Sequence, residues 1–243
     1  MRIIKLSATD STNSYLKHLY NREKLEDYTA VIAQTQTKGR GQMGTVWQSQ
    51  SHKNLTFSVF KAVSGFCLKD SFFISMVVAL AVVKTLEELS VTRLSIKWPN
   101  DILSERKKIC GILIENVIKQ NAMAASVIGI GLNVNQTNFE GLPQASSLKV
   151  LCGTSFNTDE IALRIIQHLK QCFVLLEQGQ FDEVKNVYES YLFRKNKPST
   201  FKDAEGKLFL GIIQGVAKSG SLLVLLENNQ LKEFNLKEIT LLY

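Results

Sequence analysis

The 243-residue sequence has little of what marks several large protein classes. It contains only 3 prolines and 14 glycines, which excludes collagen-like and low-complexity chains. Hydrophobic residues make up 45% of the chain and charged residues 21%, so the chain is not of the disordered class. A chain of this length can bury a core without disulfides. The composition predicts an ordinary globular protein, either one large domain or one domain with a small companion.

Cysteine and histidine are scarce as well. No CxxC pair occurs, and the 4 cysteines and 3 histidines offer no recognisable zinc spacing. We therefore expect reduced, structural thiols. The histidines lie outside all the motifs described below, so no Ser/His/Asp set is discernible and nucleophilic catalysis by a side chain is disfavoured. These residues are Cys67, Cys110, Cys152 and Cys172, and His18, His52 and His168.

Long hydrophobic runs are missing. The longest, Phe72–Val83, is flanked by charges and is shorter than the roughly 20 residues that a membrane crossing needs, so it predicts a buried helix. The first ten residues, MRIIKLSATD, have neither an extended apolar region nor a small-residue cleavage site. We expect a cytoplasmic protein with no membrane partner.

The charge is mildly basic and evenly distributed. Lys and Arg total 29 against 22 Asp and Glu, a net charge of +7, and there is no basic tail. Such an excess suits nucleic acids and anionic small molecules such as nucleotides equally well. Charge alone does not decide the partner.

Hydrophobic periodicity predicts an α+β fold in two domains. Helices should surround a mainly antiparallel sheet in residues 1–195, and a small β-barrel should form residues 196–243, with the boundary within 194–198. The expected strands cover residues 2–6, 29–36, 54–63, 93–98, 110–119 and 126–134, and then 208–213, 220–227 and 231–242 in the barrel. One expected helix is capped by Asp10 or Ser11. The other expected helices cover residues 70–88, 158–178 and 182–193.

The segment GRGQMG, residues 39–44, places three glycines between two expected strands. Backbone N–H groups of such a loop can close around an anion, and Arg40 supplies a planar donor fork for phosphate or carboxylate. The spacing matches neither a Walker loop nor a dinucleotide-binding fingerprint. Taken alone, the segment favours a flexible surface turn over an anion site, by roughly two to one.

Three further segments carry polar residues at expected strand ends. The motif KWPND, residues 97–101, projects Asn100 and Asp101 beyond a strand, where an amide can contact a purine and a carboxylate can hold Mg²⁺ or an amine. A turn is the alternative. Lys107 and Lys108 begin the strand KKICG, unless they are a solvated charge run. The segment GIGLNVN, residues 129–135, ends a third strand with glycines that permit close backbone approach.

Together these segments resemble one family, the biotin protein ligases, in order and spacing. The segments are DSTN (10–13), GRGQMG with Trp47 three residues on, KWPNDIL, KKICGILIEN and GIGLNVNQ. The likeness covers Ser7 to Leu148 in detail and the remainder loosely. It implies a catalytic fold related to class II aminoacyl-tRNA synthetases, followed by an SH3-like β-barrel. The implied activity forms biotinyl-5′-AMP from biotin and ATP with Mg²⁺, and then transfers biotin to a lysine of a biotin carboxyl carrier protein.

The resemblance also implies roles for individual residues. Arg40 and Lys108 would be catalytic, bracketing the biotin carboxylate and the ATP α-phosphate, and Asp101 would hold the metal. Gln42 departs from a pattern with a second Arg after GRG, which leaves one cation fewer to retain the adenylate. The biotin contacts would be Ser11, Thr12, Gln36, Gly39, Arg40, Lys108 and Gly111, and the ATP contacts Arg40, Gln42, Trp47, Asn100, Asp101 and Asn133.

Three rival hypotheses remain. A lipoate ligase shares the reaction and fold but carries a different glycine loop. A DNA-binding repressor would need an N-terminal helix-turn-helix, for which the pattern starting by Ser7 leaves no room, so we expect no DNA partner. A non-catalytic adaptor would have lost Arg40 or Lys108, and both are present. A homodimer is an option that the resemblance leaves open.

Overall fold

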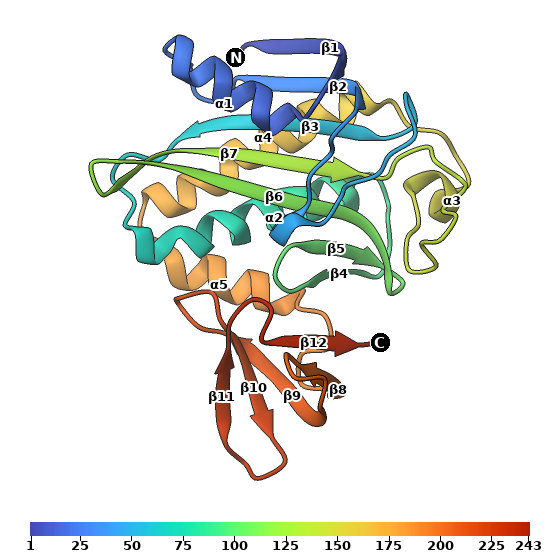
Figure 1. The fold of residues 1–243 in the computed structure, drawn as a ribbon, viewed down its shortest axis with the longest axis vertical. Helices are drawn as coiled ribbons and strands as arrows, with labels where there is room; N and C mark the ends of the chain where they lie inside the picture. Colours follow the sequence, from blue (N-terminus) through green and yellow to red (C-terminus); the bar gives the residue numbers. More distant parts are fainter.

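The computed structural model describes residues 1–243, which form two sheets (Figure 1). The larger sheet has seven strands in the order β1-β2-β3-β7-β6-β5-β4. Only β1 and β2 pair in parallel, so the predicted mainly antiparallel sheet is confirmed. The strands are β1 Ile3–Thr9, β2 Ala30–Gln36, β3 Leu55–Ala62, β4 Leu94–Lys97, β5 Asp101–Ser104, β6 Lys107–Lys119 and β7 Ala122–Leu132.

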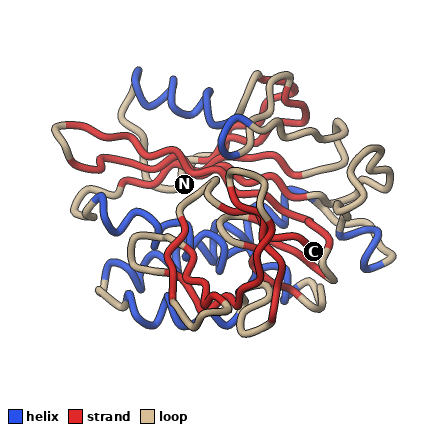
Figure 2. The backbone as a smooth tube through the Cα atoms, turned by 60° about the horizontal axis from the view of Figure 1, so that its bottom comes forward, coloured by secondary structure: helices blue, strands red, loops and turns tan.

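Helices cover both faces of this sheet unequally. The helices α2, α4 and α5 pack on one face, and α1 lies alone on the other (Figures 1 and 2). The helix α2 contacts α4, α5 and the strands β4 to β6, which explains why its sequence is apolar almost all round. The helices are α1 Thr12–Arg22, α2 Ser71–Glu88, α3 Leu148–Cys152, α4 Thr158–Glu177 and α5 Phe181–Ser190.

The C-terminal part forms a five-stranded antiparallel sheet in the order β11-β10-β9-β8-β12. This second antiparallel sheet agrees with the small SH3-like part that was expected here, and it is not closed, because β11 and β12 lie at opposite edges and do not pair. The single strand expected over 231–242 is two strands, separated where Asn235 N donates to the Glu238 carboxylate at 2.7 Å and Lys237 takes a φ of 71°. The strands are β8 Pro198–Asp203, β9 Leu208–Val216, β10 Leu222–Leu226, β11 Leu231–Phe234 and β12 Ile239–Leu242.

Three elements escaped the sequence prediction, namely β5, β8 and the short helix α3. The strand β5 matters most, because Asp101 does not project beyond a strand end, as expected, but opens β5 between β4 and β6. Ile102 and Leu103 within it are both fully buried. With both sides covered, the strand lacks the alternation by which a half-buried strand is recognised.

The smaller sheet adjoins the larger part beside α5 and the β4 end of the larger sheet (Figure 1), and one apolar core of 46 buried residues includes side chains from both. Among the hydrogen bonds that join the parts, two connect segments well separated in the chain. Trp98 Nε1 donates to the Gly220 carbonyl at 2.8 Å, and Val216 N donates to the carboxylate of Glu189 at 3.0 Å. The predicted boundary at 195/196 falls between α5 and β8 and stays a prediction.

The structure bears on two expectations from the sequence, namely those about membrane spans and about the cysteines. No helix combines the length and the hydrophobicity that crossing a membrane requires. All four cysteines are free, with Cys110 and Cys172 buried and Cys67 exposed.

Candidate active site

The predicted site residues meet in one cavity of about 380 Å³. Its wall is made by the start of α1, the glycine loop, the strands β4 to β7 and the smaller sheet. Of the residues expected in the site, all but Gly39 and Asn133 line this cavity. The cavity therefore brings together segments from residue 11 to residue 131 that the sequence could place only one by one.

One end of the cavity is polar and buried. Ser11 caps the N-terminus of α1, and Thr12 is its first residue. The Thr12 N–H donates to Gln36 Oε1 at 2.8 Å, and the Thr12 hydroxyl donates to the same oxygen at 3.1 Å. Gln36 is the last residue of β2. Its side chain therefore joins the end of this strand to the backbone at the start of α1. This end can supply several hydrogen bonds to a compact polar ring.

Two residues beneath this end, Ser58 and Asn13, had no role predicted from the sequence. Ser58 Oγ on β3 lies 2.7 Å from Thr12 Oγ1 and 2.6 Å from Asn13 Oδ1. Asn13 fills the space above Gly129, where an added Cβ would lie 2.5 Å from Asn13 Oδ1. The DSTN segment pointed to Asn13, but nothing local to Ser58 could have indicated it.

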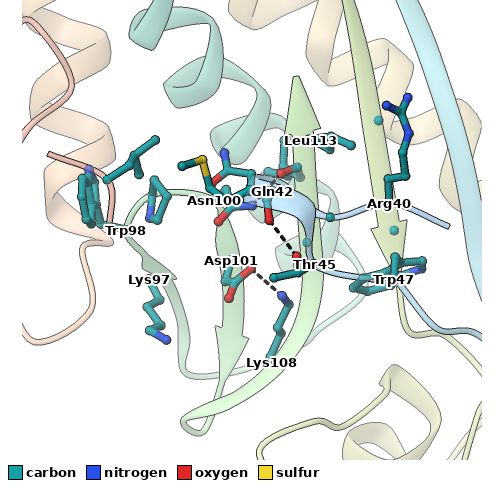
Figure 3. A pocket seen from close by; sticks show the side chains of 18 of the residues that line it. Arg40, Gln42, Thr45, Trp47, Lys97, Trp98, Asn100, Asp101, Lys108 and Leu113 are labelled. Carbon is teal, nitrogen blue, oxygen red and sulfur yellow. Dashed lines mark hydrogen bonds and ion pairs between the residues drawn. The ribbon is translucent and has the colours of Figure 1, made fainter. Parts of the chain in front are cut away.

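Lys108 and Asp101 form an ion pair with 2.7 Å between Nζ and Oδ1 (Figure 3). Lys108 lies on β6 and Asp101 opens the neighbouring β5. The Lys108 backbone is fixed on its other side, since its N–H donates to the Gln144 carbonyl at 2.6 Å and its carbonyl accepts from Ser146 N at 3.0 Å. A cation is thus held on a rigid strand, with one carboxylate beside it.

Lys97 is a second cation beside Lys108 and was not assigned a role from the sequence. Burial lowers its pKa from the ordinary lysine value, and Asp101 and Lys108 act on it in opposite directions. Its Nζ lies 4.6 Å from the ring centre of Tyr243, within reach of a cation–π interaction. The ring of Tyr243 also meets Phe193 edge-on.

Asn100 and Asn133 hold backbone in place. Asn100 Nδ2 donates to the Ile112 carbonyl at 2.7 Å, so this residue faces the cavity while tied to β6. Asn133 is buried and donates to the Ser146 carbonyl at 3.0 Å. Asn133 thereby fixes the segment that pairs with the Lys108 backbone, and the structure does not bring its side chain to the cavity.

Trp47 and two strand glycines form a slot in the cavity floor. An added Cβ on Gly131 would lie 2.4 Å from Trp47 Cε2, and one on Gly111 would lie 3.1 Å from Trp47 Cζ3. Gly39 is needed for a similar reason, because a Cβ there would lie 2.3 Å from the Trp47 carbonyl oxygen. Trp47 Nε1 is buried without a hydrogen-bond partner, so it is a donor available to a ligand.

Arg40 is not directed at Lys108. Its guanidinium pairs with Glu115 at 2.9 Å and donates to Ser14 Oγ at 3.1 Å. Figure 3 shows the Arg40 guanidinium lying apart from the Lys108 ammonium, which is turned to Asp101. The implied bracket of two cations around one reaction centre is therefore not assembled in this structure.

The smaller sheet supplies part of the wall, which the sequence analysis did not predict. Its lining residues include Ile213, Leu222, Lys237, Ile239 and Thr240. Their contact with the cavity depends on how the two sheets pack, and no local signal announces it. The lining contains no cysteine or histidine, and Asp101 is its single acidic residue.

The fold and the site define a protein with a mixed α+β part that holds one cavity of about 380 Å³ next to a glycine loop. The model of the biotin/lipoate A/B protein ligase family matches residues 6–133. The chain belongs to this family.

Individual relatives are similar over nearly the whole chain. The bifunctional ligase/repressor BirA of Bacillus subtilis is 30% identical over 230 residues, which cover 93% of this chain and 68% of that protein. The biotin–[acetyl-CoA-carboxylase] ligase of Paracoccus denitrificans is 26% identical, covering 90% of this chain and 92% of its own. The structure of the Aquifex aeolicus biotin protein ligase in complex with biotin and ATP superposes with a TM-score of 0.82 at 29% identity, covering 99% of this chain and 98% of that one.

Proposed function

We propose that this protein is a biotin protein ligase that makes biotinyl-5′-AMP from biotin and ATP and transfers the biotinyl group to a lysine of a biotin carboxyl carrier protein or domain. The observation that carries the proposal is the cavity in which Thr12 and Gln36 lie at one end and the Lys108–Asp101 pair lies on the strand wall. The similarity to biotin ligases, including one solved with biotin and ATP, supports it.

The first step joins two anions. A carboxylate oxygen of biotin attacks the α-phosphorus of ATP, a P–O bond forms, and the bond to pyrophosphate breaks. Charge builds up on the phosphoryl oxygens, so fixed cations lower the barrier. Lys108 is placed for this task, because hydrogen bonds on both sides of its strand fix its backbone. Arg40 would join it by turning away from Glu115.

Asp101 fits the needs of Mg²⁺, which proteins bind through one or two carboxylates with the rest of the shell from phosphate and water. It is the one acidic residue of the lining. Mg²⁺ bound there would neutralise phosphate charge as a Lewis acid. When phosphate arrives, Lys108 can exchange its contact with Asp101 for one with a phosphate oxygen.

The second step needs the adenylate to survive. Biotinyl-5′-AMP is a mixed anhydride that water hydrolyses, so the glycine loop and Trp47 would shield it. The deprotonated amine of the carrier lysine then attacks the carbonyl carbon, an amide forms and AMP leaves. No nucleophile of this protein is required, in line with the lack of a Ser/His/Asp set. The split into domains 1–195 and 196–243, the cytoplasmic location, the absence of DNA binding and a homodimer stay predictions.

The deciding experiment is incubation with ATP, Mg²⁺ and biotin, followed by mass detection of biotinyl-5′-AMP. A parallel reaction with lipoate in place of biotin tests the related activity of the same family. We expect adenylate from biotin and, after addition of a carrier domain, a carrier carrying one biotinyl group. Adenylate from lipoate alone would overturn the assignment of substrate, and no adenylate from either would overturn the activity.

A further inference from the structure

Glu115 is a half-buried carboxylate on β6 to which neither the motifs nor the proposed mechanism gives a role. Its side chain is 20% exposed and receives three donors besides solvent. Asn13 Nδ2 lies 2.8 Å from Oε2, Lys17 Nζ lies 3.1 Å from Oε1, and Arg40 Nη2 lies 2.9 Å from Oε2. Burial raises the pKa of Glu115, but the contacts with Asn13, Lys17 and Arg40 outweigh it and hold the pKa below the ordinary value. The carboxylate is thus charged at neutral pH.

This carboxylate would not be left unpaired if Arg40 moved away. Lys17 and Asn13 come from α1 and stay in contact whatever the glycine loop does. Arg40, in contrast, lies in an exposed loop, and 43% of its side chain is accessible. Breaking a buried ion pair is costly mainly because it strands a charge, and here the remaining cation prevents that. The exchange of Arg40 to another anion is therefore inexpensive.

A chain of hydrogen bonds connects Glu115 to the polar end of the cavity. From Glu115 it passes to Asn13, then through Ser58 to Thr12, with contacts of 2.8, 2.6 and 2.7 Å. The partner of Arg40 is consequently fixed by the same buried groups that border the proposed biotin site. The position of Glu115 is set by the core rather than by the loop.

We infer that Glu115 is a positioning residue that keeps Arg40 outside the reaction site in the ligand-free protein and releases it when anionic ligands enter the cavity. The inference deepens the proposed function and rests on it for the identity of those ligands. Only the fraction of molecules with Arg40 released binds the ligands fully, so the pair with Glu115 weakens their apparent affinity by that fraction.

The variants E115Q and K17Q separate this role from a merely structural one. In E115Q the amide oxygen still accepts from Asn13, but the charge that holds Arg40 is gone. In K17Q the competing cation is gone, so Glu115 holds Arg40 more tightly. The two variants should act in opposite directions, whereas general damage to the region would act in one. The variant E23Q, which removes an exposed ion pair with Arg2 far from the cavity, is the matched control and should behave as the wild type.

The first measurement needs no ligand. Limited trypsin digestion followed by mass spectrometry gives the ratio of cleavage after Arg40 to cleavage after Lys38, and Lys38 serves as an internal reference for loop opening. We expect the ratio to rise about two- to fivefold in E115Q, as for a partly exposed ion pair, and to fall in K17Q. Raising the salt concentration should raise the ratio in the wild type itself, which keeps the test valid if a variant does not fold. An unchanged ratio in E115Q and with salt would overturn the inference.

The second measurement follows adenylate formation. E115Q should lower the KM for biotin by about two- to fivefold at nearly unchanged kcat, K17Q should raise it, and E115Q should have no effect in an R40A background. A loss of kcat in E115Q that persists in R40A would contradict the inference and make Glu115 a structural support. If the wild type forms no adenylate, the proposed function fails, and the ligand-free digestion still decides whether Glu115 holds Arg40.

Discussion

Two walls of the cavity each carry a cation paired with a carboxylate, but one wall is made of paired strands and the other is a loop. The strand wall, defined by Asp101, Lys108, Gly111 and Gly131, belongs to the paired strands β5 to β7. The loop wall, residues 39–47, is mostly exposed and contains Arg40 and Trp47. Each wall presents one key cation, Lys108 beside Asp101 and Arg40 beside Glu115. The strand wall is built from paired strands, whereas we expect ligands to order the glycine-rich loop wall. A cation on a fixed strand suits fast formation of the adenylate. A movable loop suits binding of the substrates and retention of the adenylate.

The strand wall is tested most directly by Lys108→Ala. Removing a preorganised cation where charge develops typically costs about 10²–10³ in rate, and biotin binding should weaken less. Pyrophosphate release in a single turnover measures the step. The neighbouring Lys107→Ala is the control, because the Lys107 side chain donates to the Pro143 carbonyl and does not line the cavity. A near-normal rate in the Lys108 variant would remove Lys108 from the reaction centre.

The contact between the two walls is tested by Gly131→Ala. The new methyl group would overlap Trp47 Cε2, at 2.4 Å, so the indole has to move. Overpacking of this kind costs about 1–3 kcal/mol, which should appear as weaker biotin binding in calorimetry. In a Trp47→Ala background the same change should have little further effect. Wild-type affinity in the single variant would show that the slot is not part of the ligand site.

The loop wall alone is tested by Gln42→Arg. Gln42 lines the cavity, and its carbonyl accepts from the Thr45 hydroxyl at 2.8 Å. Charge-assisted bonds to phosphate are stronger than neutral ones, so the adenylate should stay about tenfold longer, equivalent to ~1.4 kcal/mol, with little change in its rate of formation. Stopped-flow measurement of adenylate dissociation checks this. A change confined to the formation rate would mean that position 42 does not face the phosphate.

The smallest effect is expected in the dynamics of the loop wall. Three glycines make the loop costly to order, so biotin and ATP together should slow amide hydrogen exchange over residues 39–46 by a few-fold, on the order of the protection seen for local closure. The amides of β6 should change little, because their ladder is already formed. Equal slowing in both segments would erase the distinction between the two walls.

Much of the fold could be predicted because its signals are local. The strands β2, β3, β6 and β7 and the helices α2, α4 and α5 appear where hydrophobic periodicity placed them. The strand β5 could not be predicted, since both of its faces are buried and it has only four residues. The division of residues 231–242 into β11 and β12 was missed for a related reason. The turn between them depends on the contact of Asn235 with Glu238 and on the backbone of Lys237, which hydrophobic periodicity does not report.

The candidate site divides in the same way. The residue types of the site, and the motif order that identifies the family, are properties of the sequence by itself. The pairing of Lys108 with Asp101 follows once β5 and β6 are neighbours.

Only the tertiary structure decided that Arg40 meets Glu115, 75 positions along the chain, that Ser58 lies under Thr12, and that the smaller sheet closes the cavity. The residue types of a motif can be read from neighbouring positions in the sequence. Contacts between distant segments depend on strand register and on the packing of sheets, which no short stretch of sequence encodes.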